Sequence, residues 1–231
     1  MEDIKSFNVD EVPNSSYNIF LGKRRSGKSV LCEYMVKEMI DKKMLDLVFL
    51  FSKTDAGFTT IQKDCRFDTI EPLHKIIENM KHINEYNKDA KKSKKIKVRC
   101  MCIIDDMALQ LKNKSECTIL SSLATNGRHY AYEPCALHFC ILSQSLTKIP
   151  RVCRLNCDCI FFNNIASAIE LALLMDENFY LIDSSSKGKK EARKLYNDLV
   201  TSEDYIFVCV ENHKQNIKKY QDYIKTYKAI L

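Results

Sequence analysis

The sequence has little that would place the chain in or across a membrane. Its apolar runs are shorter than about 18 residues, the minimum for a membrane-spanning helix. The N-terminus, Met1 to Lys5, lacks the basic and then apolar pattern of a secretory signal peptide. The sequence also has no internal repeat and no long low-complexity segment. We therefore expect an intracellular protein. Its 231 residues, 45% of them hydrophobic, suit one globular α/β domain.

The eleven cysteines do not form the pattern of a secreted disulfide framework. Their number is odd and most lie within apolar runs, which is typical of reduced core residues in a reducing compartment. Cys153, Cys157 and Cys159 could suggest zinc. However, no second Cys-x-x-Cys or histidine pair completes a four-ligand set, and alternate residues of a strand point to opposite faces.

Glycine is scarce, with five residues in the chain, yet two of them lie in one eight-residue segment. The segment reads Gly22-Lys23-Arg24-Arg25-Ser26-Gly27-Lys28-Ser29 and matches the P-loop pattern at every fixed position. The two glycines allow backbone N–H groups to surround phosphates closely. Lys28 would reach the β- and γ-phosphates, and Ser29 would bind Mg²⁺. The segment therefore predicts a bound nucleoside triphosphate, taken as ATP.

The sequence on both sides of this segment agrees with that prediction. Residues 17–21 are apolar and aromatic and predict a buried strand. Residues 27–42 carry apolar side chains at helical spacing and predict an amphipathic helix. A chance glycine-rich turn before a helix is the alternative, and the order of strand, loop and helix argues against it.

Strands and helices alternate along the rest of the chain. We expect further strands at 45–51, 98–104, 136–142, 157–162 and 204–210, and helices from 71, at 115–128, 166–176 and 189–200. This alternation predicts an α/β fold with a mostly parallel sheet covered by helices on both faces. We expect residues 1–13 to be a short irregular leader and residues 14–231 to form a single P-loop domain.

An acidic pair follows the strand at 98–104. An apolar strand that ends in two acids is the Walker B pattern, so Asp105 would hold Mg²⁺ and Asp106 would orient or deprotonate the attacking water. A strand lies between this pair and the P-loop in sequence, which favours the sheet class used by water-activating ATPases. In that class the strand at 136–142 lies between the two motif strands and points Gln144 at the γ-phosphate. The alternative for Gln144 is a plain turn residue.

The net charge of +6 is unevenly distributed. One cluster, which includes Lys91, Lys92, Lys94 and Lys95, lies in a linker that we expect beside the ATP site, where it could contact DNA. A solvated loop is the equally plain alternative. A second group of lysines, between 214 and 228, reads as a solvated helix face or a polyanion contact.

Five sequence pieces together resemble the poxvirus-type genome-packaging ATPases of large DNA viruses and virophages, within the FtsK/HerA superfamily. The pieces are Gly22–Ser29, Ile103-Ile104-Asp105-Asp106, Asn126-Gly127-Arg128-His129-Tyr130, Ser143-Gln144-Ser145 and Arg154-x-Asn156-Cys157-Asp158. They span about 17 to 162, and residues 163–231 give only a general fit. The second Walker B acid is Asp106, where many members of the superfamily have glutamate.

The resemblance implies a RecA-like (ASCE) ATPase that uses ATP and Mg²⁺. It implies a homo-oligomeric ring, a pentamer or hexamer, that moves double-stranded DNA into a capsid and therefore contacts capsid proteins. The location implied is the host-cell cytoplasm, at the viral factory, and the virion. Ring motors place an arginine at the neighbour's γ-phosphate. Arg128 is the first candidate, with Arg151 and Arg154 next, and Arg24 or Arg25 could act in cis instead.

Two other functions stay open from the sequence. A small P-loop nucleoside or nucleotide kinase would need an arginine-rich lid, which we do not find. An assembly factor whose oligomeric state is switched by ATP would need neither DNA nor an acceptor. Stimulation of hydrolysis by double-stranded DNA separates the three functions.

Overall fold

The structure is a computed structural model that describes residues 4–54, 57–107, 114–165, 167–179 and 183–230. Its strands are β1 (Tyr17–Leu21), β2 (Leu47–Phe51), β3 (Arg66–Phe67), β4 (Arg99–Asp105), β5 (Ala136–Ser143), β6 (Cys159–Phe162), β7 (Phe207–Glu211) and β8 (Ile224–Tyr227). Its α-helices are α1 (Lys28–Asp41), α2 (Glu71–Asp89), α3 (Lys114–Asn126), α4 (Arg151–Leu155), α5 (Ala168–Leu174) and α6 (Ser186–Val200).

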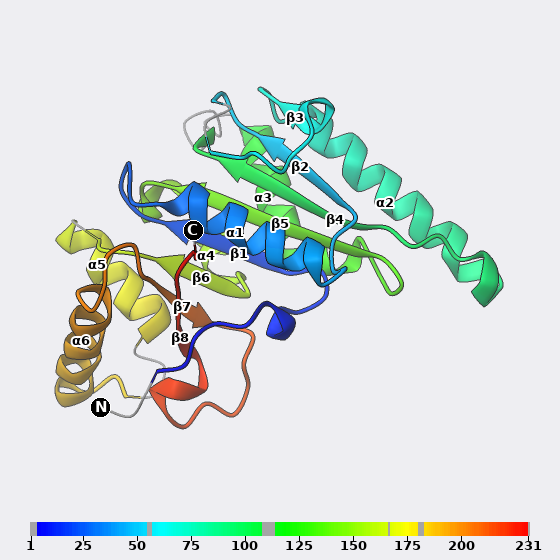
Figure 1. The fold of residues 1–231 in the computed structure, drawn as a ribbon. Coiled ribbons are helices and arrows are strands. Elements are labelled where there is room, and N and C mark those ends of the chain that lie inside the picture. Colours follow the sequence, from blue (N-terminus) through cyan, green and yellow to red (C-terminus); the bar gives the residue numbers. More distant parts are fainter. Residues whose placement is uncertain (1–3, 55–56, 108–113, 166, 180–182, 231) are drawn as a thin grey trace.

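All eight strands form one sheet in the order β3-β2-β4-β5-β1-β6-β7-β8 (Figure 1). The strands from β3 to β6 are parallel, whereas β7 is antiparallel to both β6 and β8. β5 lies between β1 and β4, so a strand separates the P-loop strand from the acidic strand as predicted. The α/β class and the mostly parallel sheet are therefore confirmed.

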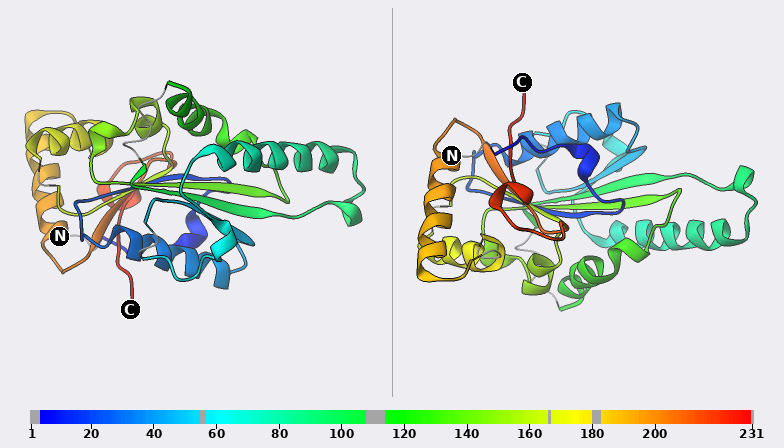
Figure 2. Two further views of the ribbon diagram at one scale, coloured as in Figure 1. Left: turned by 90° about the horizontal axis from the view of Figure 1, so that it is seen from above. Right: turned by 90° about the horizontal axis from the view of Figure 1, so that it is seen from below.

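The sheet is covered on both faces, and its strands alternate between two cores. Side chains at odd positions of β1, such as Ile19, pack in one core with residues of α2, α3 and α6, whereas Phe20 packs in the other core against α1. Edge-on views of the sheet show α1 on one face and α2 to α5 on the other (Figure 2). Among the helices of the described ranges, none is long and apolar enough to cross a membrane.

The largest departures from the predicted elements lie after β5 and at the sheet edges. The short strands β3 and β8 and the one-turn helix α4 were not predicted. The last predicted strand exists as β7 but runs antiparallel, and α5 ends at Leu174, where a π-helical turn replaces it. The two residues of β3 and the single turn of α4 are too short to show a period of their own. Strand direction is set by pairing rather than by local sequence.

The N-terminal segment, expected to be an irregular leader, contributes to the sheet and the core. Ser6 forms an isolated parallel bridge with Thr226, beside β8. Phe7 is buried, and its ring meets Phe161 edge-on at 5.0 Å and contacts Tyr227 at the same distance. Because these contacts join the first residues to the last strand, we expect that residues 4–12 stabilise the C-terminal edge of the sheet.

His138 is an ionisable side chain in the middle of the structure. It lies in β5, is 2% exposed, and its Nδ1 is 2.9 Å from the hydroxyl of Ser16. Burial lowers the pKa of His138 from its ordinary 6.5 to about 4. The folded protein therefore keeps this imidazole neutral at pH values at which the unfolded chain binds a proton.

This difference predicts a specific pH dependence of stability. The stability that the neutral His138 contributes to the folded protein is fully present above pH 6.5. It is lost as the pH falls towards 4, because in that range only the unfolded state takes up the proton. We expect the free energy of unfolding to fall by about 1.4 kcal/mol per pH unit in that range. In His138→Gln this part of the slope should be absent, as measured by urea unfolding at several pH values. Equal slopes in both proteins would contradict the assignment.

Candidate functional site

The residues predicted to bind the phosphates, the metal and the attacking water lie together at the carboxyl ends of the strands, which we call the carboxyl edge of the sheet. The strands β1, β4 and β5 are parallel neighbours, so their carboxyl ends meet there, where ligands bind in open α/β sheets. Leu21 is paired with Ser143, and Asp105 with Leu142. The P-loop, the acidic pair and Gln144 follow directly from these paired positions.

The P-loop has the conformation that its glycines were predicted to allow. Gly27 has φ = 88°, a conformation that favours glycine. A Cβ at Gly22 would lie 2.6 Å from the Ser26 hydroxyl oxygen, so any other residue there would displace the Ser26 side chain. Arg25 also adopts a positive φ of 63°. The loop is anchored to β5 by a 3.2 Å hydrogen bond from the Gly22 N–H to the Ser143 carbonyl.

Two polar groups inside the loop fit a bound phosphate. Lys28 is 7% exposed, and its Nζ donates to the Lys23 carbonyl at 3.2 Å, across the loop. Burial lowers the pKa of this ammonium, while Asp106 and Asp105 oppose the shift. Ser26 Oγ is buried, and no hydrogen-bond partner for it lies within the described residues. A phosphate in the loop would supply both groups with an acceptor.

Ser29 and Asp105 form a pair of oxygen ligands beside the loop. Ser29 Oγ donates to Asp105 Oδ2 at 3.2 Å. Asp105 is 8% exposed, and burial raises the pKa of its carboxyl, with Ser29 and Lys28 acting in the opposite direction. A buried carboxylate and a hydroxyl are ligands that Mg²⁺ prefers. The donor set therefore fits the predicted metal, which would also relieve the buried negative charge.

Asp106 and Gln144 are in direct contact across the ends of β4 and β5. The Gln144 amide donates a hydrogen bond to Asp106 Oδ2, and the Asp106 N–H donates to the Leu142 carbonyl at 3.1 Å. Asp106 has a positive φ of 52°, a strained conformation for a residue other than glycine. Both side chains are exposed, so water can reach the pair directly.

Two carboxylates missed by the sequence analysis hold the segments around this edge. Glu33, buried in α1, accepts hydrogen bonds from the N–H and hydroxyl groups of Thr59 and Thr60. Glu170 of α5 accepts from the hydroxyls of Ser145 and Thr147, just after Gln144. Neither glutamate belongs to a motif, and their partners are 23 to 27 residues away, so sequence offered no signal.

The candidate arginines lie in three different environments. Arg24 and Arg25 are exposed on the P-loop itself, whereas Arg128 is exposed at the amino ends of the strands, in a small hollow with Tyr17 and Asp158. Arg128 thus lies at the amino ends of the strands, whereas its own P-loop lies at their carboxyl ends. Arg154 is 8% exposed, and its guanidinium donates to both Glu177 carboxylate oxygens at 2.9 Å.

The lysine cluster does not lie beside the nucleotide site, so that part of the prediction is wrong. Lys91, Lys92, Lys94 and Lys95 are exposed in the segment between α2 and the amino end of β4. The acidic pair lies at the other end of the same seven-residue strand. The carboxyl end of α2 and the segment after it extend beyond the rest of the molecule (Figure 2). A contact between these lysines and DNA stays a prediction.

Two of the lysines near the C-terminus form close ion pairs. Lys214 contacts Glu11 at 2.5 Å, and Lys228 contacts Glu203 at 2.7 Å. In the part of the chain that the structure describes, no group of three or more histidine, cysteine or acidic residues gathers in a way that could hold a metal ion. The cysteines whose side chains the structure describes form no disulfide.

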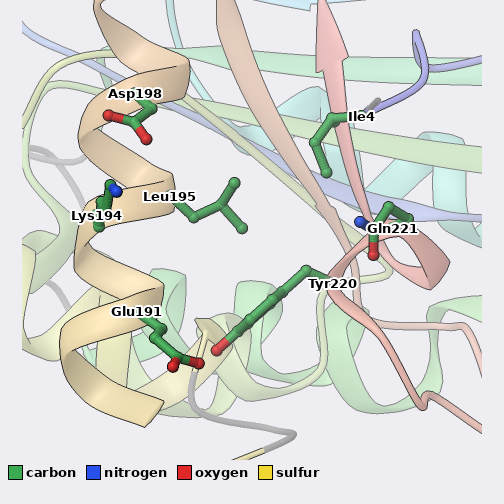
Figure 3. Close-up of a pocket in the computed structure, with 7 residues that line it drawn as sticks. All are labelled: Ile4, Glu191, Lys194, Leu195, Asp198, Tyr220 and Gln221. Carbon is green, nitrogen blue, oxygen red and sulfur yellow. The ribbon is translucent and has the colours of Figure 1, made fainter. Parts of the chain in front are cut away.

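Two hollows of comparable size lie on different sides of the chain. One, of about 450 Å³, adjoins the P-loop and is lined by Gly27, Tyr205, Phe207 and Lys228, among others. The other, of about 360 Å³, lies between α6 and the segment before β8. In this second hollow Leu195 projects from α6, and the Tyr220 side chain extends from the opposite side towards Glu191 (Figure 3). It contains none of the predicted site residues.

The sequence matches no protein-family model and no curated protein. The fold, in contrast, matches solved structures over nearly the whole chain. The sulfate complex of the genome packaging NTPase B204 from Sulfolobus turreted icosahedral virus 2 superposes with a TM-score of 0.62 at 15% identity, over 95% of this chain and 99% of that chain. Its complex with AMPPCP gives 0.60 at 16% identity, over 94% and 99%.

A conjugation coupling protein shows the same fold. The pCW3 conjugation coupling protein TcpA, in its monomer form with ATPγS, superposes with a TM-score of 0.59 at 14% identity, over 94% of this chain and 60% of that chain. At these identities the similarity establishes the fold. The chain therefore has the architecture of the P-loop NTPases of the ASCE class, as the resemblance implied.

The environment of Arg154 predicts a structural role for this arginine. Arg154→Ala leaves Glu177, whose side chain is 9% exposed, as an uncompensated buried charge. We expect a loss of about 3–5 kcal/mol in the free energy of unfolding, measured by denaturant titration. The double variant Arg154→Met with Glu177→Leu should lose far less, because it removes both charges. A loss below about 1 kcal/mol in the single variant would contradict this role.

Proposed function

We propose that this protein is an ATP-hydrolysing motor that translocates double-stranded viral DNA into a capsid. The observation that supports hydrolysis best is the contact between Asp106 and Gln144, next to the P-loop and the Ser29–Asp105 pair. Asp106 is exposed and Asp105 is buried, so the two acids have different roles. The buried acid suits a metal, and the exposed acid suits a water.

The reaction follows from these placements. Backbone N–H groups of the P-loop and the Lys28 ammonium would bind the phosphates, and Ser29 and Asp105 would hold Mg²⁺. When bound, Mg²⁺ would supply positive charge that stabilises the transferring phosphoryl group. Asp106 accepts a hydrogen bond from the attacking water and, as it reacts, its proton. Gln144 orients that water while its amide holds Asp106 in place.

The similar structures support the translocation part of the proposal. B204 is described as a genome packaging NTPase, and TcpA as a conjugation coupling protein. Exposed lysines at the far end of α2 would contact the DNA backbone electrostatically. As a packaging motor, the protein would contact capsid proteins. It would be located at the viral factory in the host-cell cytoplasm and in the virion.

The position of Arg128 supports assembly into a ring. It lies at the sheet edge opposite its own P-loop, so it cannot reach the γ-phosphate of the same subunit. We therefore assign it to the neighbour's site, in a pentamer or hexamer, where it would stabilise developing negative charge. Arg24 and Arg25 are the cis alternative, because both are exposed on the loop itself.

The first test is ATP hydrolysis with and without double-stranded DNA. We expect Mg²⁺-dependent phosphate release that rises when DNA is added, and none in Lys28→Ala, because that variant lacks the charge that clamps the phosphates. Hydrolysis indifferent to DNA would contradict a translocase and favour an ATP-switched assembly factor. Phosphate transfer to an added nucleoside would instead indicate a kinase.

The second test separates the two acids. Asp106→Asn should bind ATP normally but hydrolyse it about 10²- to 10⁴-fold more slowly, the range for loss of a general base. Asp105→Asn should weaken Mg²⁺-dependent nucleotide binding as well. Equilibrium binding and single-turnover hydrolysis, measured on the same preparations, give both quantities. Loss of ATP binding in Asp106→Asn would show that this acid has a structural or metal-binding role.

A further inference from the structure

The hollow that adjoins the P-loop is formed by parts of the chain far apart in sequence. Its lining combines Arg25, Gly27, Val30 and Leu31 with residues from the two ends of the C-terminal hairpin. Those residues are Tyr205, Phe207, Lys228 and Ala229. The volume, about 450 Å³, is in the range of small-ligand sites.

The antiparallel direction of β7 explains why these residues reach the P-loop. In β6, Phe162 pairs with Leu21, the residue before the P-loop, and also with Val208 at the beginning of β7. Phe207 in turn pairs with Tyr227, at the end of β8. The beginning of one strand and the end of the next therefore lie at the same edge as the P-loop.

Tyr205 is held directly against the loop. A Cβ built on Gly27 would lie 3.4 Å from Tyr205 Cδ1 and 4.0 Å from Phe207 Cε2, so both rings lie on the open side of Gly27. Tyr205 nonetheless has 64% of its surface exposed and adopts a positive φ of 58°. An exposed aromatic ring on a strained backbone, beside a phosphate site, is a surface on which a planar group can stack.

We propose that this hollow holds the nucleobase of the bound triphosphate, stacked on Tyr205. The inference rests on the proposed function, since the phosphates must lie in the P-loop for the base to reach this position. Gly27 contributes both to the P-loop and to the lining, so the two sites are continuous. Lys228, which forms an exposed ion pair with Glu203 at 2.7 Å, lines one side of the hollow.

The assignment also gives the C-terminal hairpin a role in ligand binding. Val30 is 41% exposed next to the buried Leu31, and Ala229 faces them from the chain after β8. These apolar groups offer area to a base but no fixed set of donors and acceptors. Stacking accepts any base, because every base has a π-face.

The test compares two ligands that differ by the nucleoside. One is a non-hydrolysable ATP analogue, and the other is inorganic tripolyphosphate, which has phosphates but no base. Each is titrated with Mg²⁺ into the wild type, Tyr205→Ala, Tyr205→Phe and Tyr86→Ala by calorimetry. Tyr86 is 51% exposed on α2, away from the site, and serves as the matched control.

We expect Tyr205→Ala to bind the ATP analogue about 5- to 100-fold more weakly, the range for loss of one stacked base. Its affinity for tripolyphosphate should equal that of the wild type. Tyr205→Phe and Tyr86→Ala should bind both ligands as the wild type does. Ala229→Trp, which fills the hollow, should weaken only the ATP analogue. Melting temperatures measured on the same samples show that each variant is folded.

Three outcomes would overturn the inference. Unchanged binding of the ATP analogue in Tyr205→Ala and Ala229→Trp would place the base elsewhere. Equal weakening of both ligands would show that Tyr205 acts by shaping the P-loop at Gly27. Failure of the folded wild type to bind either ligand would overturn the proposed function itself, and this inference with it.

Discussion

The parallel pairing of β4, β5 and β1 is the constraint on which the rest of the site depends. The carboxyl ends of neighbouring parallel strands lie side by side, so the residues that follow these strands are close to one another. The P-loop, Asp105 with Asp106, and Gln144 each follow one of these strands. The central position of β5 places Gln144 between the phosphate loop and the acids, where it contacts Asp106. A different strand order would separate these groups although every motif remained.

Burial distributes charge around this edge unevenly. Lys28 and Asp105 are both under 10% exposed. Burial lowers the pKa of Lys28 and raises the pKa of Asp105, so it favours the neutral form of each side chain. Each is only partly compensated by the other, and Ser26 Oγ remains without a partner among the described residues. The triphosphate with Mg²⁺ that we propose would supply the opposite charges. Its binding would then offset the unfavourable burial of these two charged groups.

The segments around the edge are tied to helices by single carboxylates. Glu33 joins α1 to residues 59 and 60, and Glu170 joins α5 to the residues after Gln144. Ser145 directly follows Gln144, so Glu170 joins α5 to the segment just after the carboxyl end of β5.

The sequence alone determined the local parts of this protein. The P-loop pattern predicted a strand before it and a helix after it. The acidic pair at the end of β4 could be predicted as well, because each of these two motifs lies within a few consecutive residues. The strand between them in sequence even predicted the central place of β5. Only the tertiary structure decided what depends on long-range pairing. It turned β7 antiparallel, brought Tyr205 and Lys228 to the P-loop, and placed the lysine cluster and Arg128 at the opposite edge. Strand direction and the edge at which a loop emerges are set by partners far along the chain, and local composition does not encode them.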